Sequence, residues 1–225
     1  MITNPYIVFD FETGSKYPET TQPIQLAAVL VDPIKLEIIE GSEFESLIQP
    51  VFDINECKKL NIAPIEDEAL NVNKKTITEL EKAPKLEHVW TNFTNHVKTF
   101  QKGKNNHWNA PIPVGYNIAR FDLVIVDRLC KTYGPFDDKN AKQKIFHPIY
   151  YIDVMQSFVQ WFSNWNQINS FSLSKLLEVT GVDGDGAHDA MVDVKNTANM
   201  FIRFSKLYRS INDEAKPKIK WKPIN

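Results

Sequence analysis

The chain has 225 residues, a length that suits one domain of good size, and its 43% hydrophobic residues can fill a core. The formal net charge is −2, so no global basic field marks a polyanionic partner, although a cleft needs only local basicity. The start MITNPYIVFD has no signal-peptide pattern, and no apolar stretch is long enough to span a membrane. Cys57 and Cys130 have no CxxC partner and fit a reducing compartment. We therefore expect a soluble cytoplasmic protein without membrane contact.

The first half of the chain predicts three strands followed by helices. Tyr6–Phe11 and Ile24–Val31 are apolar runs bounded by proline or glycine, and Glu37–Ile48 supplies a third strand, antiparallel to the second. Ile54–Leu80 is mixed in character and predicts short helices. Leu86–Phe100 carries apolar residues at helical spacing and predicts an amphipathic helix.

The second half alternates two further strands with helices. Gly181 is the expected stop of one helix, and Asp153 is the expected N-cap of another. The expected elements are strands at Ile112–Tyr116 and Ile149–Ile152, and helices at Asp122–Tyr133, Asp153–Ser163, Ser172–Val179 and His188–Leu207. This order predicts an α/β fold in which a mixed central sheet, a three-strand meander plus two further strands, is flanked by helices.

The first chemical signal is a pair of carboxylates inside the first strand. Asp10 and Glu12 are two residues apart, so they point to the same face of the strand, and their neighbours are apolar. Two buried carboxylates repel each other and are costly to desolvate, whereas a divalent cation would offset both effects. The alternative is that the strand ends at Phe9 and that both acids point to water.

Two more signals follow later in the chain. Asp122 stands at the expected start of a helix, directly after a strand, where ligands collect in open α/β sheets. An acid at a helix start can also serve only as a cap. His188 stands at the start of the last helix, aimed by a glycine-rich loop, and Asp193 projects from its second turn. For His188 the alternative is a surface or cap residue.

Taken together, these motifs resemble those of the DnaQ-like exonucleases of the DEDDh type. The shared pattern is DxE on the first strand, an aspartate near a later helix start, and H-x4-D on the last helix. The resemblance runs from Tyr6 to about Phe204. It implies a ribonuclease H-like fold and two Mg²⁺ or Mn²⁺ ions per active site. It further implies that Asp10, Glu12, Asp122 and Asp193 hold the metals and that His188 acts as general base.

The same resemblance implies where the substrate binds. Backbone amides at Thr13 and Gly14 are expected to meet the terminal sugar, and Asn117 stands where the family commonly has an asparagine. The Phe11 region is a candidate wedge against the last base, with a place in the core as the alternative. Lys74 and Lys75 are candidates for phosphate contact or for an ordinary solvated surface, and Asp153 for support of the metal site.

We therefore expect residues 1–210 to form the exonuclease domain and residues 211–225 a lysine-rich tail. The expected partner is the 3′ end of a nucleic acid, single-stranded DNA in the first place, with RNA trimming or an oligoribonuclease as the alternative. Two further hypotheses are a non-catalytic nucleic-acid-binding module and a proofreading subunit of a polymerase.

Overall fold

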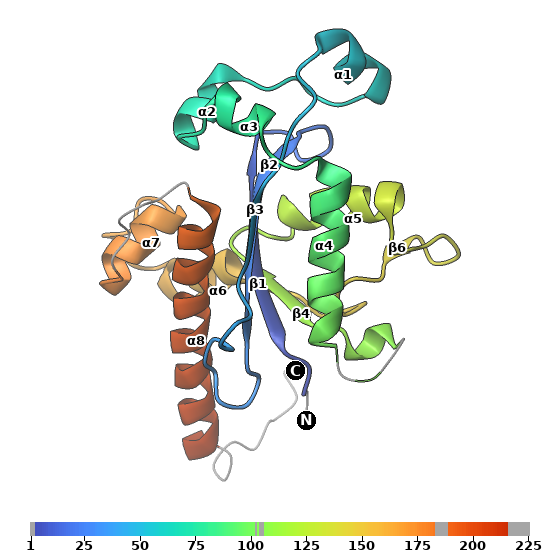
Figure 1. Ribbon diagram of the computed structural model, residues 1–225. Coiled ribbons are helices and arrows are strands. Elements are labelled where there is room, and N and C mark those ends of the chain that lie inside the picture. Colours follow the sequence, from blue (N-terminus) through green and yellow to red (C-terminus); the bar gives the residue numbers. More distant parts are fainter. Residues whose placement is uncertain (1–2, 102, 104–105, 183–188, 216–225) are drawn as a thin grey trace, which may run out of the picture.

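The computed structural model describes residues 3–101, 103, 106–182 and 189–215, and the side chains of the last helix as far as residue 211 (Figure 1). The strands are β1 (Tyr6–Thr13), β2 (Pro23–Val31), β3 (Phe44–Leu47), β4 (Ile112–Gly115), β5 (Phe136–Asp137), β6 (Lys142–Gln143) and β7 (Ile152–Asp153). The helices are α1 (Ile54–Leu60), α2 (Asp67–Val72), α3 (Ile77–Glu81), α4 (Leu86–Thr99), the short 3₁₀ helix η1 (His107–Asn109), α5 (Asp122–Tyr133), α6 (Val154–Phe162), α7 (Leu173–Thr180) and α8 (Ala190–Ala215).

Five strands form one mixed sheet in the order β3-β2-β1-β4-β7. The strands β1, β2 and β3 form an antiparallel meander, while β4 runs parallel to β1 and β7 parallel to β4. β2 is buried along its whole length, which explains its continuous apolar sequence. The predicted fold class, a meander plus two further strands flanked by helices, is confirmed.

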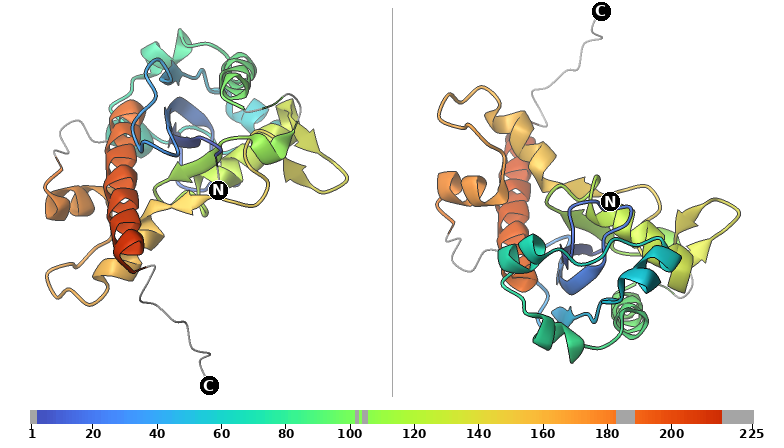
Figure 2. Two further views of the ribbon diagram at one scale, coloured as in Figure 1. Left: turned by 90° about the horizontal axis from the view of Figure 1, so that it is seen from below. Right: turned by 90° about the horizontal axis from the view of Figure 1, so that it is seen from above.

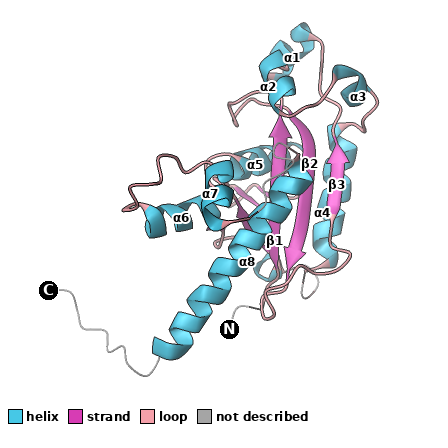
Figure 3. Cartoon of the chain, turned by 90° about the vertical axis from the view of Figure 1, so that its left-hand side faces the viewer, coloured by secondary structure: helices cyan, strands magenta, loops and turns pink. Residues whose placement is uncertain are grey.

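Helices cover both faces of the sheet, with α8 on one side and α4 and α5 on the other (Figures 1 and 3). On the α4 and α5 side, Phe9 of β1 packs with Phe93 and Ile125. On the α8 side, Val8 packs with Val194. Because side chains alternate along a strand, the face of β1 that carries Val8 also carries its two acids.

The helices α1 to α3 form a connector that packs over the edge of the sheet where β1 ends and β2 begins (Figure 1). The Glu66 amide donates to the Gly14 carbonyl at 2.9 Å, and Asn73 Nδ2 donates to the Thr13 carbonyl at 2.9 Å. Ile24 of β2 packs against apolar side chains of the connector. The connector buries Leu70 and Leu80 in this contact, while most of its other residues are exposed.

The last strand is shorter than the predicted Ile149–Ile152, because β7 comprises only Ile152–Asp153. The backbone N–H groups of Ile149 and Tyr150 donate to His147 Nδ1, at 3.2 and 3.0 Å. The His147 side chain therefore accepts the amide hydrogens that would otherwise bond to a neighbouring strand. The third strand is also shorter than the predicted Glu37–Ile48, because only residues 44–47 pair as a strand with β2.

The last helix begins two residues later than predicted, at Ala190, and continues past Leu207 to Ala215. Its start is fixed by Asp189, whose Oδ1 accepts hydrogen bonds from the amides of Met191 and Val192. The predicted boundary at residue 211 falls inside α8, and the lysine-rich stretch 216–225 lies outside the described residues. Among the described residues, α8 included, there is no helix with the length and apolar character needed to cross a membrane.

Candidate metal centre and active site

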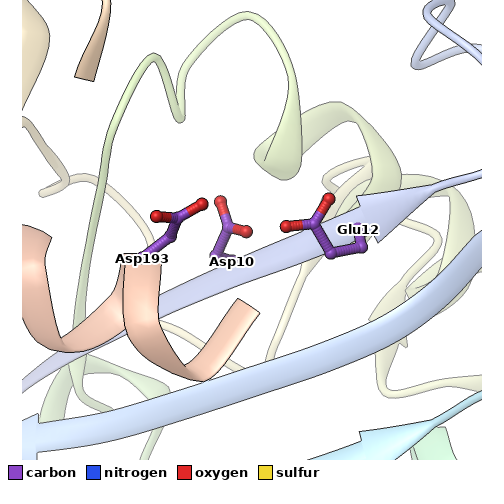
Figure 4. Close-up of side chains that lie close together, drawn as sticks. All are labelled: Asp10, Glu12 and Asp193. Atoms are coloured by element: carbon purple, nitrogen blue, oxygen red, sulfur yellow. The ribbon is translucent and has the colours of Figure 1, made fainter. Parts of the chain in front are cut away.

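Three carboxylates meet where β1 passes the start of α8. Asp10 and Glu12 come from β1 and Asp193 from the first turn of α8, one turn earlier in the helix than predicted (Figure 4). One oxygen from each lies within 4.8 Å of the others. Clustered carboxylate oxygens are the ligands that hard cations such as Mg²⁺ and Mn²⁺ prefer. The donor set therefore fits the metals that the sequence motifs imply.

The electrostatics of this group also fit a cation. Burial raises the pKa of Asp10 well above its usual range, and the charges of Asp122, Glu12 and Asp193 raise it further. Burial, with the charge of Asp193, raises the pKa of Glu12 to about 7, although Lys75 opposes the shift. When ionised, these carboxylates repel one another, and a divalent cation would offset this repulsion.

Asp122 lies beside this group rather than inside it. It is the first residue of α5, its side chain is buried, and its Oδ1 accepts the Phe11 amide at 3.2 Å. That amide lies beyond Val8, where the pairing of β1 with β4 ends, so Asp122 satisfies a donor that the sheet leaves open. Burial raises the pKa of Asp122 to about 7. The structure thus brings three of the predicted ligands together and places the fourth at their side.

Asp153 holds the loop that leads from β4 to Asp122. Its carboxylate accepts the Asn117 and Ala119 amides, at 3.1 and 3.4 Å, as well as the Met155 amide at 3.1 Å. It is thus the N-cap of α6, as predicted, and a support of the loop at the same time.

A polar network beside the site was missed from the sequence. Asp189 Oδ2 accepts hydrogen bonds from Gln25 Nε2 at 3.4 Å and from Lys75 Nζ at 3.2 Å. Gln25 lies opposite Glu12 in the β1–β2 register, and its side chain is buried. The signal was present, because Gln25 is a polar residue at a strand position that an otherwise apolar run predicts to be buried. Lys75 is thus engaged by Asp189 rather than simply solvated.

Of the residues predicted to contact substrate, Phe11 is buried in the core and Asn117 lies in a loop near Asp122. The Phe11 side chain packs in the core and is 4% exposed, so its role as a wedge remains a prediction that this packing does not support. Asn117 has a left-handed backbone and lies in the loop between β4 and Asp122, close to the carboxylates along the chain.

The Thr13–Gly14 segment is engaged within the protein. Thr13 Oγ1 donates to the Ser15 carbonyl, and the Gly14 amide donates to the Gln22 carbonyl at 2.8 Å. A Cβ on Gly14 would lie 2.1 Å from Ile65 Cδ1, so the close approach that requires glycine is made by the connector. Contact of these amides with a terminal sugar stays a prediction. His188, the predicted general base, lies outside the described residues.

Comparison with protein families identifies the class. The family model described as exonuclease (RNase_T) matches residues 7–201. The chain belongs to this exonuclease family, whose members are phosphodiester hydrolases. A search of the curated proteins finds no significant match.

Solved structures share the fold at low sequence identity. Escherichia coli exonuclease I in complex with a dT13 oligonucleotide matches with a TM-score of 0.68 and 20% sequence identity. The match covers 94% of this chain and 43% of the exonuclease I chain. The cell-death related nuclease CRN-4 has a TM-score of 0.66 and 18% identity, covering 91% of this chain and 64% of its own. A 3′-exonuclease that recognises the 3′ end of histone mRNA stem-loop has a TM-score of 0.64 and 19% identity, covering 92% of this chain and 83% of its own. The chain therefore spans less than two thirds of the first two.

Proposed function

We propose that the protein is a metal-dependent 3′-to-5′ exonuclease that removes nucleoside 5′-monophosphates from single-stranded or frayed 3′ ends of DNA. The observation that carries this proposal is the group of three carboxylates, Asp10, Glu12 and Asp193, within 4.8 Å of one another. A phosphodiester is itself an anion, so these carboxylates alone would repel it, and the site requires cations before it can accept substrate.

Asp10, Glu12, Asp122 and Asp193 would together hold two Mg²⁺ or Mn²⁺ ions, as the family resemblance implies. When bound, such a pair lowers the pKa of water and stabilises charge on the attacking and leaving oxygens. The contribution of the chain is rigidity. The Phe11 amide fixes the orientation of the Asp122 carboxylate, and Asp193 is held in the first turn of a long helix.

The same resemblance assigns His188 as the general base that takes the proton of the attacking water. An unperturbed imidazole has a pKa of about 6.5 and is therefore mostly neutral at slightly alkaline pH, as a base must be. The next residue, Asp189, accepts hydrogen bonds from Gln25 and Lys75, so the residue that follows the proposed base is held at the start of α8. The last phosphodiester is cleaved, and the product leaves as a 5′-monophosphate.

DNA is the polymer to test first, because exonuclease I, whose complex with a dT13 oligonucleotide is known, shares the fold. RNA is the alternative, since an exonuclease of histone mRNA shares the same fold at a similar TM-score. The 2′-hydroxyl distinguishes the two polymers.

The test is digestion of 5′-labelled single-stranded DNA and RNA of the same sequence, in Mg²⁺, Mn²⁺ or EDTA. We expect a metal-dependent ladder that shortens from the 3′ end, with DNA the faster substrate, and no ladder from Asp10→Ala or Asp193→Ala. His188→Ala should lose turnover but keep metal binding. Faster shortening of RNA would change the assigned polymer. Shortening of neither polymer with either metal would leave a non-catalytic binding module.

A further inference from the structure

Gln25 is a polar side chain in a row of apolar ones. The face of β2 that packs against α8 carries Gln25, Ala27, Val29 and Val31, because every second side chain of a strand points to the same side. All of them are buried, and Gln25 is only 2% exposed. A glutamine at such a position costs free energy unless its amide group finds partners, so the partners indicate what the side chain does.

Both ends of the Gln25 amide group have partners. Nε2 donates to Glu45 Oε1 at 2.9 Å and to Asp189 Oδ2 at 3.4 Å. Oε1 accepts the backbone amide of Ala190 at 3.4 Å. These partners fix the orientation of the group, because a flipped amide would place its oxygen against two carboxylates. Two of the contacts are long, so the side chain acts through all three together rather than through one strong bond.

Two of these partners stand at the start of α8. The first amides of a helix have no acceptor within the helix itself. Gln25 accepts the Ala190 amide, whereas Asp189 Oδ1 accepts those of Met191 and Val192. Gln25 thus completes the cap from another element, and it also bonds to the carboxylate that provides the rest of the cap. The start of α8 is therefore tied to β2 as well as capped by its own chain.

This tie lies directly beside the candidate metal ligands. Gln25 is opposite Glu12 in the ladder of β1 and β2, so the two side chains are neighbours on one face of the sheet. Asp193 lies in the first turn of α8, three residues after Ala190. Both views of Figure 2 show α8 alongside the blue strands of the meander. A shift or rotation of the first turn would therefore change the distance between Asp193 and the carboxylates of β1.

The contact of Lys75 with Asp189 does not duplicate that of Gln25. Lys75 donates to the same Asp189 oxygen, at 3.2 Å, but it belongs to the connector and not to the sheet. An ammonium group can only donate, so it cannot accept the Ala190 amide. Gln25 bonds to the helix amide and to the capping carboxylate at once, and it does so from the strand that pairs with β1.

We infer that Gln25 is a positioning residue, which holds Asp193 at the right distance from the carboxylates of β1 and thereby sets the affinity of the site for divalent cations. This inference rests on the proposed function, because it concerns the same carboxylates. Gln25 itself touches neither metal nor substrate, since its amide group is engaged within the protein. Loss of a residue that orients metal ligands typically costs about 10- to 100-fold in metal affinity or activity.

The test uses Gln25→Met, which keeps an unbranched side chain of similar length and removes its hydrogen bonds. The affinity for Mn²⁺ is measured without substrate, by electron paramagnetic resonance titration of the free ion, and should fall about tenfold or more. On single-stranded DNA, kcat should fall by about the same factor, while KM for the DNA should equal that of the parent. Gln25→Asn, whose amide group is one carbon too short to reach α8, should give the same losses.

The matched control is Ser42→Ala, which also removes a buried polar side chain that bonds to β2. Ser42 accepts the Leu30 amide at 2.9 Å, and Leu30 lies at the other end of the strand from Gln25. We expect the control to lower the melting temperature and to leave Mn²⁺ affinity and kcat as in the parent.

A double-mutant cycle shows whether Gln25 acts through the start of α8. Gln25→Met and Asp189→Ala are measured singly and together. If both residues hold the same helix start, the double variant should lose less Mn²⁺ affinity than the two single losses combined. Losses that add in full would show that Gln25 does not act through the cap.

The inference is overturned if Gln25→Met and Gln25→Asn melt at a lower temperature but bind Mn²⁺ as tightly as the parent, because the glutamine would then serve the fold alone. A parent that binds Mn²⁺ but cleaves no nucleic acid would refute the proposed function. The role of Gln25 would then be decided by the Mn²⁺ affinities alone. A parent that binds no Mn²⁺ would overturn both.

Discussion

Lys75 Nζ lies 3.2 Å from Asp189 Oδ2, and this ion pair joins the connector to the start of α8. Both partners border the candidate site, since both charges act on the pKa of Glu12, Lys75 lowering it and Asp189 raising it. The Lys75 side chain is 13% exposed and that of Asp189 is 38% exposed, so water screens the pair in part. We therefore expect the pair to position Asp189, the residue before α8, more than to stabilise the fold.

Lys75→Gln should accordingly affect turnover as well as stability. We expect a loss of about 0.5–1 kcal/mol in the free energy of unfolding and a three- to fivefold drop in kcat, about what such an ion pair is worth. Urea denaturation and steady-state kinetics measure the two quantities. Lys82→Gln, at an exposed connector position, is the control and should change neither. An unchanged kcat in Lys75→Gln would show that the ion pair has no positioning role.

The stability of the metal-free protein should fall as pH rises. The folded-state pKa of Glu12 is raised from 4.5 to about 7, so the folded protein holds this proton more tightly than the unfolded chain does. The resulting stability is complete below about pH 4.5 and is lost as pH rises through about 7, a change of about 3 kcal/mol from Glu12 alone. Asp10 and Asp122, with raised pKa values, act in the same direction.

Denaturation in EDTA across this pH range checks the prediction. Mg²⁺ should restore stability most at the alkaline end, because the metal replaces the protons that the carboxylates have lost. Glu12→Gln should flatten the dependence, while Glu37→Gln, at an exposed position, should leave it as in the parent. Stability that is independent of pH in EDTA would mean that burial and mutual repulsion do not raise the pKa values of these carboxylates.

Asp10→Asn should separate activity from stability. Burial and the charges of three other carboxylates raise the pKa of Asp10, so its ionisation costs stability in the metal-free protein. Asparagine cannot ionise, and the variant should therefore melt at a higher temperature than the parent at alkaline pH. Activity should fall by roughly a hundredfold or more, because a metal ligand is lost. Melting curves in EDTA and exonuclease assays in Mg²⁺ provide the two readings. A lower melting temperature together with full activity would contradict both parts of the prediction.

Asp153→Ala should reduce stability and activity together. It removes a helix cap and the acceptor of two loop amides, at a cost of about 2–4 kcal/mol. Asp53→Ala is the matched control, because Asp53 caps α1 through the Glu56 amide but lies on the exposed connector. The control should cost about 1 kcal/mol and leave kcat unchanged. Equal kcat in the two variants would limit Asp153 to capping.

Much of the sheet could be predicted from sequence because β1 and β2 carry strong local signals. Their apolar runs define buried strands, and the alternation along β1 places Asp10 and Glu12 on one face. Asp193 could be matched to the same site only through the motif, since nothing in its local sequence fixes its distance from β1.

Features set by tertiary contacts were beyond prediction. The early end of the last strand depends on where the His147 ring lies, and the β5–β6 hairpin has only two paired residues on each side. The Lys75–Asp189 pair joins residues 114 positions apart, which no periodicity can predict. The contacts of the Trp108 and Tyr150 rings with the His147 ring likewise depend on tertiary packing.

The most direct measurement of the central claim follows the terminal nucleotide itself. A single-stranded DNA that carries its label in the 3′-terminal nucleotide is mixed with excess enzyme in Mg²⁺, and the products of the first turnover are identified. We predict that the label appears at once as a nucleoside 5′-monophosphate, and that EDTA or Asp10→Ala prevents its release. Release of the label within longer fragments, or its release by Asp10→Ala at the parent rate, would contradict a 3′-to-5′ exonuclease at this site.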